Sequence, residues 1–184
     1  MENTKIAKCK IEEAEALLKC FRRVLAYGPL SSLPNRLNEA KLLEDVKEGN
    51  LFILKQNKRV LGALQATSSW GKALFKEGST YKKEMDVLDG FPYAGERIVL
   101  LDYLFIDPTF LRKKYGKSLM DTLFRRYEET SFLVSLGEED CLAFFEKMGF
   151  HHLYLEKDLN LALRGGQIYV RPNVKEGLCS KPIF

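Results

Sequence analysis

The chain lacks any long apolar run. None of its stretches approaches the ~20 consecutive apolar residues that a bilayer-spanning helix needs. Its first residues, Met1-Glu2-Asn3-Thr4-Lys5, also lack the apolar core of a secretion signal. We therefore expect no membrane association and a cytoplasmic location.

Residue types that bind metals are scarce and scattered. The 184 residues include two His and four Cys, at Cys9, Cys20, Cys141 and Cys179. No cysteines form a Cys-x-x-Cys pair, and no His lies at zinc-ligand spacing from them. We expect free buried thiols and no metal site. Cys141 also has no evident His and Asp partners that would activate it as a nucleophile, so we expect it to pack in the core.

The sequence has no strong excess of one charge. The 29 Lys and Arg residues against 25 Asp and Glu give a net charge of +4. Modules that bind nucleic acid usually show a stronger basic stripe, so a small anionic ligand fits better and we expect no nucleic acid partner. The hydrophobic fraction of 46% is ordinary for a globular protein, and the length suits a single domain over residues 1–184.

Apolar residues at strand and helix spacing predict an α/β (α+β) fold. The expected strands are 5–10, 51–54, 59–67, 97–106, 132–136, 153–163 and 167–170. The expected helices are 11–25, a second one capped by Asn35, 116–129 and 138–148. We expect an irregular insert at about 68–96 and an irregular tail from about 172.

The strongest strand, 97–106, is nearly all apolar apart from Asp102. Such a run predicts burial on both faces of a sheet. Strand alternation places Asp102 on the same face as Leu104 and Ile106. Because a buried acid must find a partner, Asp102 is either a reactive base or an anchor bonded to a neighbouring backbone N–H.

A short basic loop follows this strand. The strand ends at Asp107-Pro108, and Gly116 opens an amphipathic helix. That arrangement directs free backbone N–H groups and a helix N-terminus at one point, which attracts phosphate. Positive charge surrounds the point, from Arg112, Lys113, Lys114 and Lys117. The loop predicts a phosphorylated cofactor; the alternative is a basic loop that caps a helix by chance.

A second motif follows one strand later, at Ala143-Phe144-Phe145-Glu146-Lys147-Met148-Gly149-Phe150. Together the two motifs resemble the GNAT acyltransferase superfamily, over Arg97 to roughly Leu161. The family pattern is a strand ending in an aliphatic-x-Pro, then Arg/Gln-x-x-Gly-x-Gly/Ala, and later Phe-Tyr-Glu-Lys-x-Gly-Phe. The resemblance implies a mixed, mostly antiparallel sheet of six or seven strands, flanked by helices in three layers.

This sequence departs from the family pattern at several positions. The family's Arg/Gln falls on Leu111 and its first Gly on Lys114, so that only Gly116 is kept. Arg112 is a candidate to replace the missing charge. The Tyr that often protonates the departing thiolate falls on Phe145, which has no proton to give.

The resemblance implies acetyl-CoA, or another acyl-CoA, as the cofactor and co-substrate. The backbone of Leu104, Phe105 and Ile106 would pair with the pantetheine arm. The N–H groups from Leu111 to Lys117 would cradle the pyrophosphate; these residues are Leu111, Arg112, Lys113, Lys114, Tyr115, Gly116 and Lys117. Phe145 would lie at the cofactor in place of the family Tyr. Asp102 matches a position where the family often carries its general base.

Three functions stay open. The first is transfer of an acyl group to a primary amine, with Asp102 as base and with Tyr115, Tyr103, Tyr154 or water as acid. The second is a CoA-binding sensor of the same fold that has lost catalysis. The third is nucleic-acid binding through the basic loop, which would require a steep salt dependence. The acceptor is not readable, and the oligomeric state, a homodimer included, stays open.

Two further features carry alternatives. The aromatic residues of the insert would line an acceptor pocket or form a small core of their own. His151-His152 would contact the acceptor or simply start a strand, with one side chain in and one out.

Overall fold

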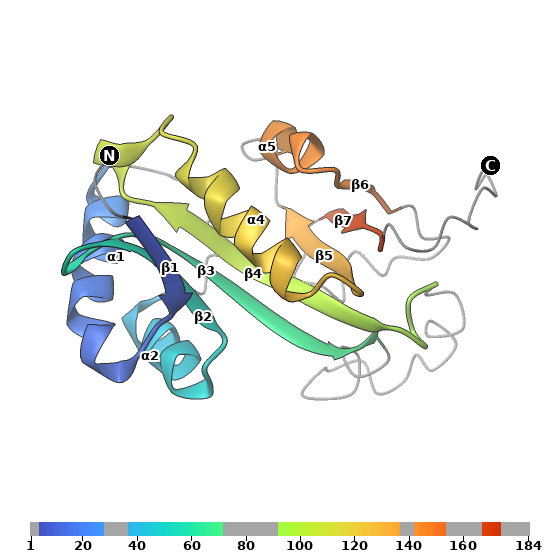
Figure 1. Ribbon diagram of the computed structural model, residues 1–184, viewed down its shortest axis with the longest axis horizontal. Coiled ribbons are helices and arrows are strands. Elements are labelled where there is room, and N and C mark those ends of the chain that lie inside the picture. The colour runs from blue at the N-terminus through green and yellow to red at the C-terminus, as the bar shows by residue number, and fades with distance from the viewer. Residues whose placement is uncertain (1–3, 28–36, 72–91, 137–141, 154–166, 174–184) are drawn as a thin grey trace.

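The structure is a computed structural model, and it describes residues 4–27, 37–71, 92–136, 142–153 and 167–173. Seven strands form one sheet in the order β1-β2-β3-β4-β5-β7-β6 (Figure 1). The strands are β1 (Thr4–Lys8), β2 (Leu51–Gln56), β3 (Arg59–Trp70), β4 (Arg97–Ile106), β5 (Ser131–Leu136), β6 (His151–His152) and β7 (Gln167–Arg171). The α-helices of the described residues are α1 (Ala14–Ala26), α2 (Glu39–Glu48), α4 (Tyr115–Arg126) and α5 (Leu142–Lys147).

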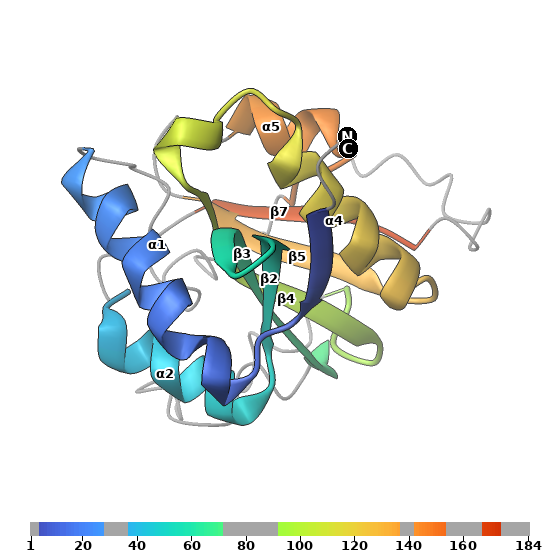
Figure 2. The same cartoon turned by 60° about the vertical axis from the view of Figure 1, so that its left-hand side comes forward.

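The helices cover both faces of the sheet. Helices α1 and α2 lie on one face, and α4 and α5 on the other (Figure 2). Each face has its own buried cluster, with Leu17 and Phe21 of α1 in one and Leu119 and Leu123 of α4 in the other. Every strand pair is antiparallel except β4 with β5. The expected three-layer, mostly antiparallel architecture is therefore confirmed.

Strand β4 crosses the middle of the sheet and is buried on both faces, as its apolar sequence predicts. Its alternation breaks at one point, because Tyr103 pairs with Gln65 while Leu101 pairs with the next residue, Ala66. Asp102 is the extra residue of this β-bulge. Leu101 and Leu104 accordingly pack on the same face, towards α4. Because of the bulge, strict alternation along β4 does not hold at Asp102. The expectation that Asp102 shares a face with Leu104 and Ile106, which rested on that alternation, is therefore not supported.

Several element boundaries differ from the sequence expectation. The first helix opens as a 3-10 turn, η1 (Ile11–Glu13), before α1 begins. Helix α2 is capped by Asn38, whose Oδ1 accepts the backbone N–H of Lys41 at 2.9 Å. Asn35, the cap we expected, lies outside the described residues. The cap therefore lies three residues later in the chain than the one expected from sequence.

The hairpin of β2 and β3 is longer than expected. Its turn is only Asn57-Lys58, with Asn57 in the left-handed region at φ 54°. Strand β3 continues to Trp70, which pairs with Arg97, so residues 68–70 of the expected insert are strand. The ladder to β4 stabilises this extension, although the two serines, Ser68 and Ser69, carry no apolar strand pattern in the sequence. Residues 72–91 of the insert lie outside the described residues.

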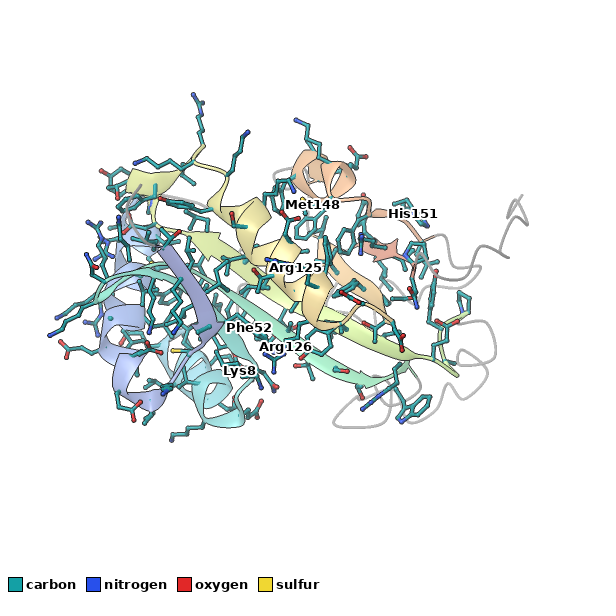
Figure 3. The ribbon with its side chains drawn as sticks, in the orientation of Figure 1. Lys8, Phe52, Arg125, Arg126, Met148 and His151 are labelled. Carbon is teal, nitrogen blue, oxygen red and sulfur yellow. The ribbon has the colours of Figure 1, made fainter. Side chains whose placement is uncertain are left out.

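The second half follows the expected order. Helix α4 begins at Tyr115, one residue before Gly116, and ends at Arg126. The Arg126 guanidinium lies over the ring of Phe52 at 5.3 Å, which joins α4 to β2 (Figure 3).

His151 and His152 form β6, with the first exposed and the second half-buried against Tyr169. The expected strand over 153–163 lies almost wholly outside the described residues.

Two of the four cysteines are described. Cys9 and Cys20 are free and buried, as expected. Burial raises the pKa of the Cys20 thiol to about 12, so it stays protonated and unreactive at neutral pH. Among the described helices, none is long and apolar enough to cross a membrane.

Candidate functional site

Strands β4 and β5 separate partway along their length. Their parallel ladder runs from Ile98 with Ser131 to Leu101 with Val134. Both strands then continue, to Ile106 and Leu136, with no further pairing between them. From Tyr103 to Ile106 the β5-facing edge of β4 therefore carries backbone groups that β5 does not use. Such an edge can pair with an extended ligand as an added strand does.

The loop after β4 presents unpaired N–H groups. A 3-10 turn, η3 (Pro108–Phe110), is followed by Arg112 and Lys114 in the left-handed region, at φ 63° and 62°. The first hydrogen bond of α4 runs from the Ser118 N–H to the Lys114 carbonyl, at 3.0 Å. The N–H groups of residues 112–117 make no hydrogen bond to any described residue. Together with the N-terminus of α4, they form a concavity suited to an anion.

These two features meet in one groove of about 290 Å³. Its lining residues come from the end of β4, the basic loop, the start of α4 and one position of α5. They are Leu104, Phe105, Ile106, Phe110, Leu111, Arg112, Lys114, Tyr115, Gly116 and Phe144. The structure thus brings together most of the residues that the sequence assigned to a cofactor, and adds Phe110 and Phe144.

Four of the expected site residues do not line this groove. Lys113 places its Nζ 5.0 Å from the centre of the Phe110 ring, and Lys117 pairs with Asp121 at 2.7 Å. Asp102 lies half-buried at the bulge, next to the point where β4 and β5 separate. The fourth is Phe145, described below. The N–H of Leu111 is also engaged, by the Pro108 carbonyl at 3.4 Å, so the open N–H groups begin at Arg112.

Phe145 is a core residue in this structure. It is 5% exposed and packs edge-on against Phe144 and Phe150, at 5.2 and 5.3 Å between ring centres. The groove is lined by Phe144 instead. Consecutive residues on a helix point about 100° apart, so only one of the two can face the groove. The structure therefore places Phe144, and not Phe145, on the groove, while a contact of Phe145 with a cofactor stays a prediction.

Gly116 leaves open space at the start of α4. A Cβ at this position would lie 3.5 Å from the Phe144 ring and 3.7 Å from a Leu104 methyl, which are ordinary contact distances. Its φ is not in the left-handed region. The protein itself therefore tolerates a small side chain here, and the space matters for a ligand that approaches the helix N-terminus.

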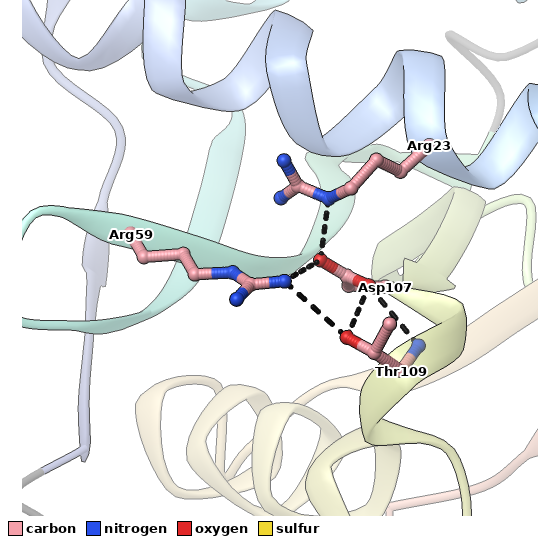
Figure 4. A network of polar contacts seen from close by, with 4 residues as sticks. All are labelled: Arg23, Arg59, Asp107 and Thr109. Atoms are coloured by element: carbon pink, nitrogen blue, oxygen red, sulfur yellow. Dashed lines mark hydrogen bonds and ion pairs between the residues drawn. The ribbon is translucent and has the colours of Figure 1, made fainter.

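A buried carboxylate anchors the start of the loop (Figure 4). Asp107 Oδ2 accepts hydrogen bonds from Arg23 Nε at 2.7 Å and from a terminal nitrogen of Arg59 at 3.0 Å. Its Oδ1 accepts the Thr109 hydroxyl at 2.8 Å and the Thr109 N–H at 3.1 Å. The Asp107 N–H donates to the Leu61 carbonyl of β3. One side chain thus joins α1, β3 and the loop.

The charge state of Asp107 follows from these bonds. Burial by itself would raise its pKa, but the hydrogen bonds from the hydroxyl, the backbone N–H and the two guanidinium groups outweigh burial. The pKa of Asp107 is therefore held below its ordinary value of 3.8, and the carboxylate stays ionised.

Tyr103 is engaged on the other face of the sheet. Its hydroxyl donates to Asp45 of α2 at 2.6 Å, and Lys41 pairs with the same carboxylate at 3.1 Å. Burial and the neighbouring carboxylate raise the pKa of Tyr103 well above its usual range. Its proton is held by Asp45, which disfavours it as an acid in the groove. Tyr115 lines the groove, and Tyr154 lies outside the described residues.

None of the remaining candidate residues that the structure describes lines the groove. Trp70 is half-exposed at the end of β3, and Tyr93 packs against a small cluster that includes Ile98 and Leu133. His152 packs its ring on Tyr169, as expected if the histidine pair simply starts a strand. Among the described residues, no group of three or more His, Cys, Asp or Glu could hold a metal ion.

Comparison with known proteins identifies the fold family. The sequence profile of the acetyltransferase (GNAT) family matches residues 14–150. The chain belongs to the GNAT acetyltransferase family. Among curated protein sequences, none matches the chain significantly.

Solved GNAT structures resemble this chain closely in fold. PaiA N-acetyltransferase from Thermoplasma acidophilum, solved with coenzyme A, superposes with a TM-score of 0.60 at 13% identity, over 92% of this chain and 99% of that one. The Drosophila melanogaster polyamine N-acetyltransferase has a TM-score of 0.63 at 15% sequence identity, over 92% of this chain and 100% of that one. The Escherichia coli ribosomal-protein-S18-alanine N-acetyltransferase has a TM-score of 0.59 at 13% sequence identity, over 93% of this chain and 94% of that one. At these identities the likeness establishes the fold.

Some site residues of this GNAT domain were not found from sequence. The motif Asp107-Pro108-Thr109 is a signature of a helix cap, with proline at the first helical position. Its arginine partners were not readable, because Arg23 and Arg59 lie 84 and 48 residues away.

The Asp107 carboxylate predicts a defined pH dependence of stability. Asp107→Asn removes both ion pairs and should lower the free energy of unfolding at pH 7 by about 1.5–3 kcal/mol, as for hydrogen bonds to a buried charge. Because the folded-state pKa lies below the unfolded value near 3.8, this contribution is present above about pH 4. It is lost as the pH falls through the folded-state pKa.

Urea unfolding of both proteins between about pH 3 and pH 7 measures this difference. Asp121→Asn is the control, since it removes an exposed pair with Lys117 and should cost only about 0.3–0.5 kcal/mol. A gap between wild type and Asp107→Asn that does not narrow at low pH would contradict the assignment.

The left-handed conformation of Lys114 predicts a second outcome. A side chain at positive φ costs roughly 1 kcal/mol, which glycine avoids. Lys114→Gly should therefore leave the free energy of unfolding unchanged or raise it by up to about 1 kcal/mol. Lys113→Gly, at a position without positive φ, should lower it by about 0.5–1 kcal/mol. Equal losses in the two variants, measured by urea unfolding, would refute a strained Lys114.

Proposed function

We propose that this GNAT domain transfers an acetyl or other acyl group from acyl-CoA to a primary amine. The observation that carries the proposal is that one groove joins the open edge of β4 to the unpaired N–H groups of residues 112–117. An extended arm with amide groups suits the edge at Leu104–Ile106, and a pyrophosphate suits the N–H groups. The coenzyme A in the Thermoplasma acidophilum relative supports this class of ligand.

The chain offers charge as well as backbone to the phosphates. Arg112 and Lys114 line the groove and are exposed, so both can approach an anion there. They replace the arginine or glutamine that the family carries at the position of Leu111, which is apolar and 51% exposed here. The bound cofactor would supply an acyl thioester, which is the electrophile of the reaction.

Asp102 is our candidate for the general base. An amine with a pKa near ~10 is mostly protonated at pH 7 and cannot attack until it loses a proton. Asp102 is a half-buried carboxylate at the bulge, next to the site where β4 and β5 part. Bulges next to active sites commonly re-aim a side chain. A carboxylate in this position would accept the proton of an acceptor amine that approaches the thioester.

The departing thiolate needs a general acid less than the attacking amine needs a general base. A thiol with a pKa near ~8.5 is a fair leaving group, so an acid accelerates the reaction without being essential. Phe145 has no proton to give, and the Tyr103 proton is held by Asp45. Tyr115, which lines the groove, and water are the remaining donors near the described residues.

Two departures from the family pattern favour a second function, a CoA-binding module without turnover. A core Phe145 at the position of the family acid and a strained Lys114 at the position of its glycine are both departures from a catalytic pattern. Such a module would bind the cofactor in the same groove. Binding and turnover must therefore be measured separately.

Gly116→Val tests the cofactor site. The branched side chain fills space beside Phe144 that a phosphate-bearing ligand would use, so affinity for CoA should fall by at least about tenfold. Titration calorimetry measures the affinity, and urea unfolding checks the fold. Gly95→Val is the matched control, because a Cβ at Gly95 meets nothing within 4 Å. Unchanged affinity of Gly116→Val would place the cofactor elsewhere.

Asp102→Asn tests the reaction. Thiol release from acetyl-CoA is followed with a panel of primary amines, as a function of pH. Losing a general base should lower kcat by about 10²–10⁴-fold at pH 7, with CoA affinity unchanged. The deficit should shrink as the pH approaches the pKa of the amine near ~10, where the acceptor is already neutral.

Three outcomes are distinguishable. Equal kcat in wild type and Asp102→Asn at every pH would make Asp102 a structural anchor. No turnover with any amine, although CoA binds, would select the binding module. Neither binding nor turnover would overturn the proposal.

A further inference from the structure

A second cavity lies between α1 and the β2–β3 hairpin. Its volume is about 650 Å³, and it shares no lining residue with the groove. Its walls come from residues 12–23 of η1 and α1 and from residues 55–60 of the hairpin. We call it the α1–hairpin cavity. No step of the proposed acyl transfer uses it.

One end of the α1–hairpin cavity is rich in positive charge. Arg23 and Arg59 line it and donate to the same oxygen of Asp107, so two guanidinium groups share a single buried carboxylate (Figure 4). Lys58 also lines the cavity and forms no ion pair with any described residue. Two guanidinium groups against one carboxylate leave this end with an excess of positive charge, and Lys58 adds a further cation to the cavity wall.

The other end is nearly balanced. Glu13 pairs with Lys55, and Glu15 pairs with Lys19 at 2.7 Å. Glu12 forms no ion pair within the described ranges and leaves this end slightly acidic. The cavity thus favours a ligand with one compact anionic group directed at the arginines, and disfavours a ligand that is anionic along its whole length.

The arginines retain donors for such a group. Arg23 reaches Asp107 through Nε alone, and Arg59 reaches Asp107 and Thr109 through one terminal nitrogen. A guanidinium carries five N–H donors in a planar fork, which matches the two oxygens of a carboxylate or phosphate. The side chains of Arg23 and Arg59 are 36% and 49% exposed, so a ligand can reach them.

We propose that the α1–hairpin cavity is a binding site for a small ligand with a carboxylate or phosphate group, held by Arg23, Arg59 and Lys58. The site lies directly behind the wall of the groove, because the Arg59 guanidinium packs 4.8 Å from the ring centre of Phe110. It is distinct from the phosphate-binding loop, which uses the opposite side of that wall.

Calorimetric titration of the full chain with inorganic phosphate and with succinate tests the site. Ionic strength is held constant, and each titration is run on the free protein and at saturating CoA, which fills the groove. We expect saturable binding that persists with CoA present. The tighter of the two anions identifies the group that the site prefers.

The matched variants are Lys58→Glu, inside the cavity, and Lys47→Glu, an identical charge change at an exposed position of α2 that does not line the cavity. Lys58→Glu should weaken anion binding by at least about tenfold, and Lys47→Glu by less than about twofold. Arg59→Lys, which keeps the charge but loses the fork, should weaken it as well. Thermal unfolding confirms that each variant is folded.

The proposal is overturned if neither anion binds saturably, if Lys58→Glu and Lys47→Glu bind the anions equally, or if CoA abolishes the binding. The last result would mean that the anion had occupied the phosphate-binding loop. If the chain does not bind CoA at all, the acyl-transfer proposal fails, while the titrations of the free protein with the same variants still decide this one.

Discussion

The buried carboxylate of Asp107 is the interaction on which the site depends. It lies at the end of β4, where the sheet gives way to the basic loop, and it receives two guanidinium groups and Thr109. Arg23 comes from α1 and Arg59 from β3, so their bonds to Asp107 fix the start of the loop to both a helix and the sheet. A charge removed from water is stable only with such partners, so these contacts hold the start of the loop against α1 and β3. Arg23 and Arg59 also line the α1–hairpin cavity, so the same contacts shape both sites.

The second constraint is the parting of β4 from β5. Pairing ends at Leu101, and the β-bulge places Asp102 immediately beyond it. The open edge of β4 exists because β4 continues to Ile106 after its pairing with β5 ends at Leu101, while β5 continues to Leu136 in its pairing with β7. The proposed ligand and the proposed acyl-transfer step therefore rest on different features of the structure. The groove and loop support the proposal of an acyl-CoA ligand, whereas the proposed transfer would use one carboxylate, Asp102, and would gain from a proton donor that Phe145 cannot supply.

The pattern of neighbouring residues predicted many of the strands and helices, and the basic loop. Strand β4 has the bounds expected from its continuous apolar run, because an element buried on both faces must be apolar along its length. The basic loop was recognisable because a strand, a basic turn and Gly116 are consecutive in the chain. The misplaced features depend on distant partners. The extension of β3 to Trp70 comes from pairing with Arg97, and the choice between Phe144 and Phe145 comes from how α5 docks on α4.

The sequence by itself determined the order of the elements, the two GNAT motifs and the basic loop that we propose binds a phosphate. Each of these is encoded by neighbouring residues, whose periodicity and backbone chemistry act locally. Only the tertiary structure decided which side chains meet. Arg23, Arg59 and Asp107 are far apart in the chain, and the bulge at Asp102 results from the register of β4 against β3. Contacts of that kind carry no periodic signal, because they form only after the layers have packed.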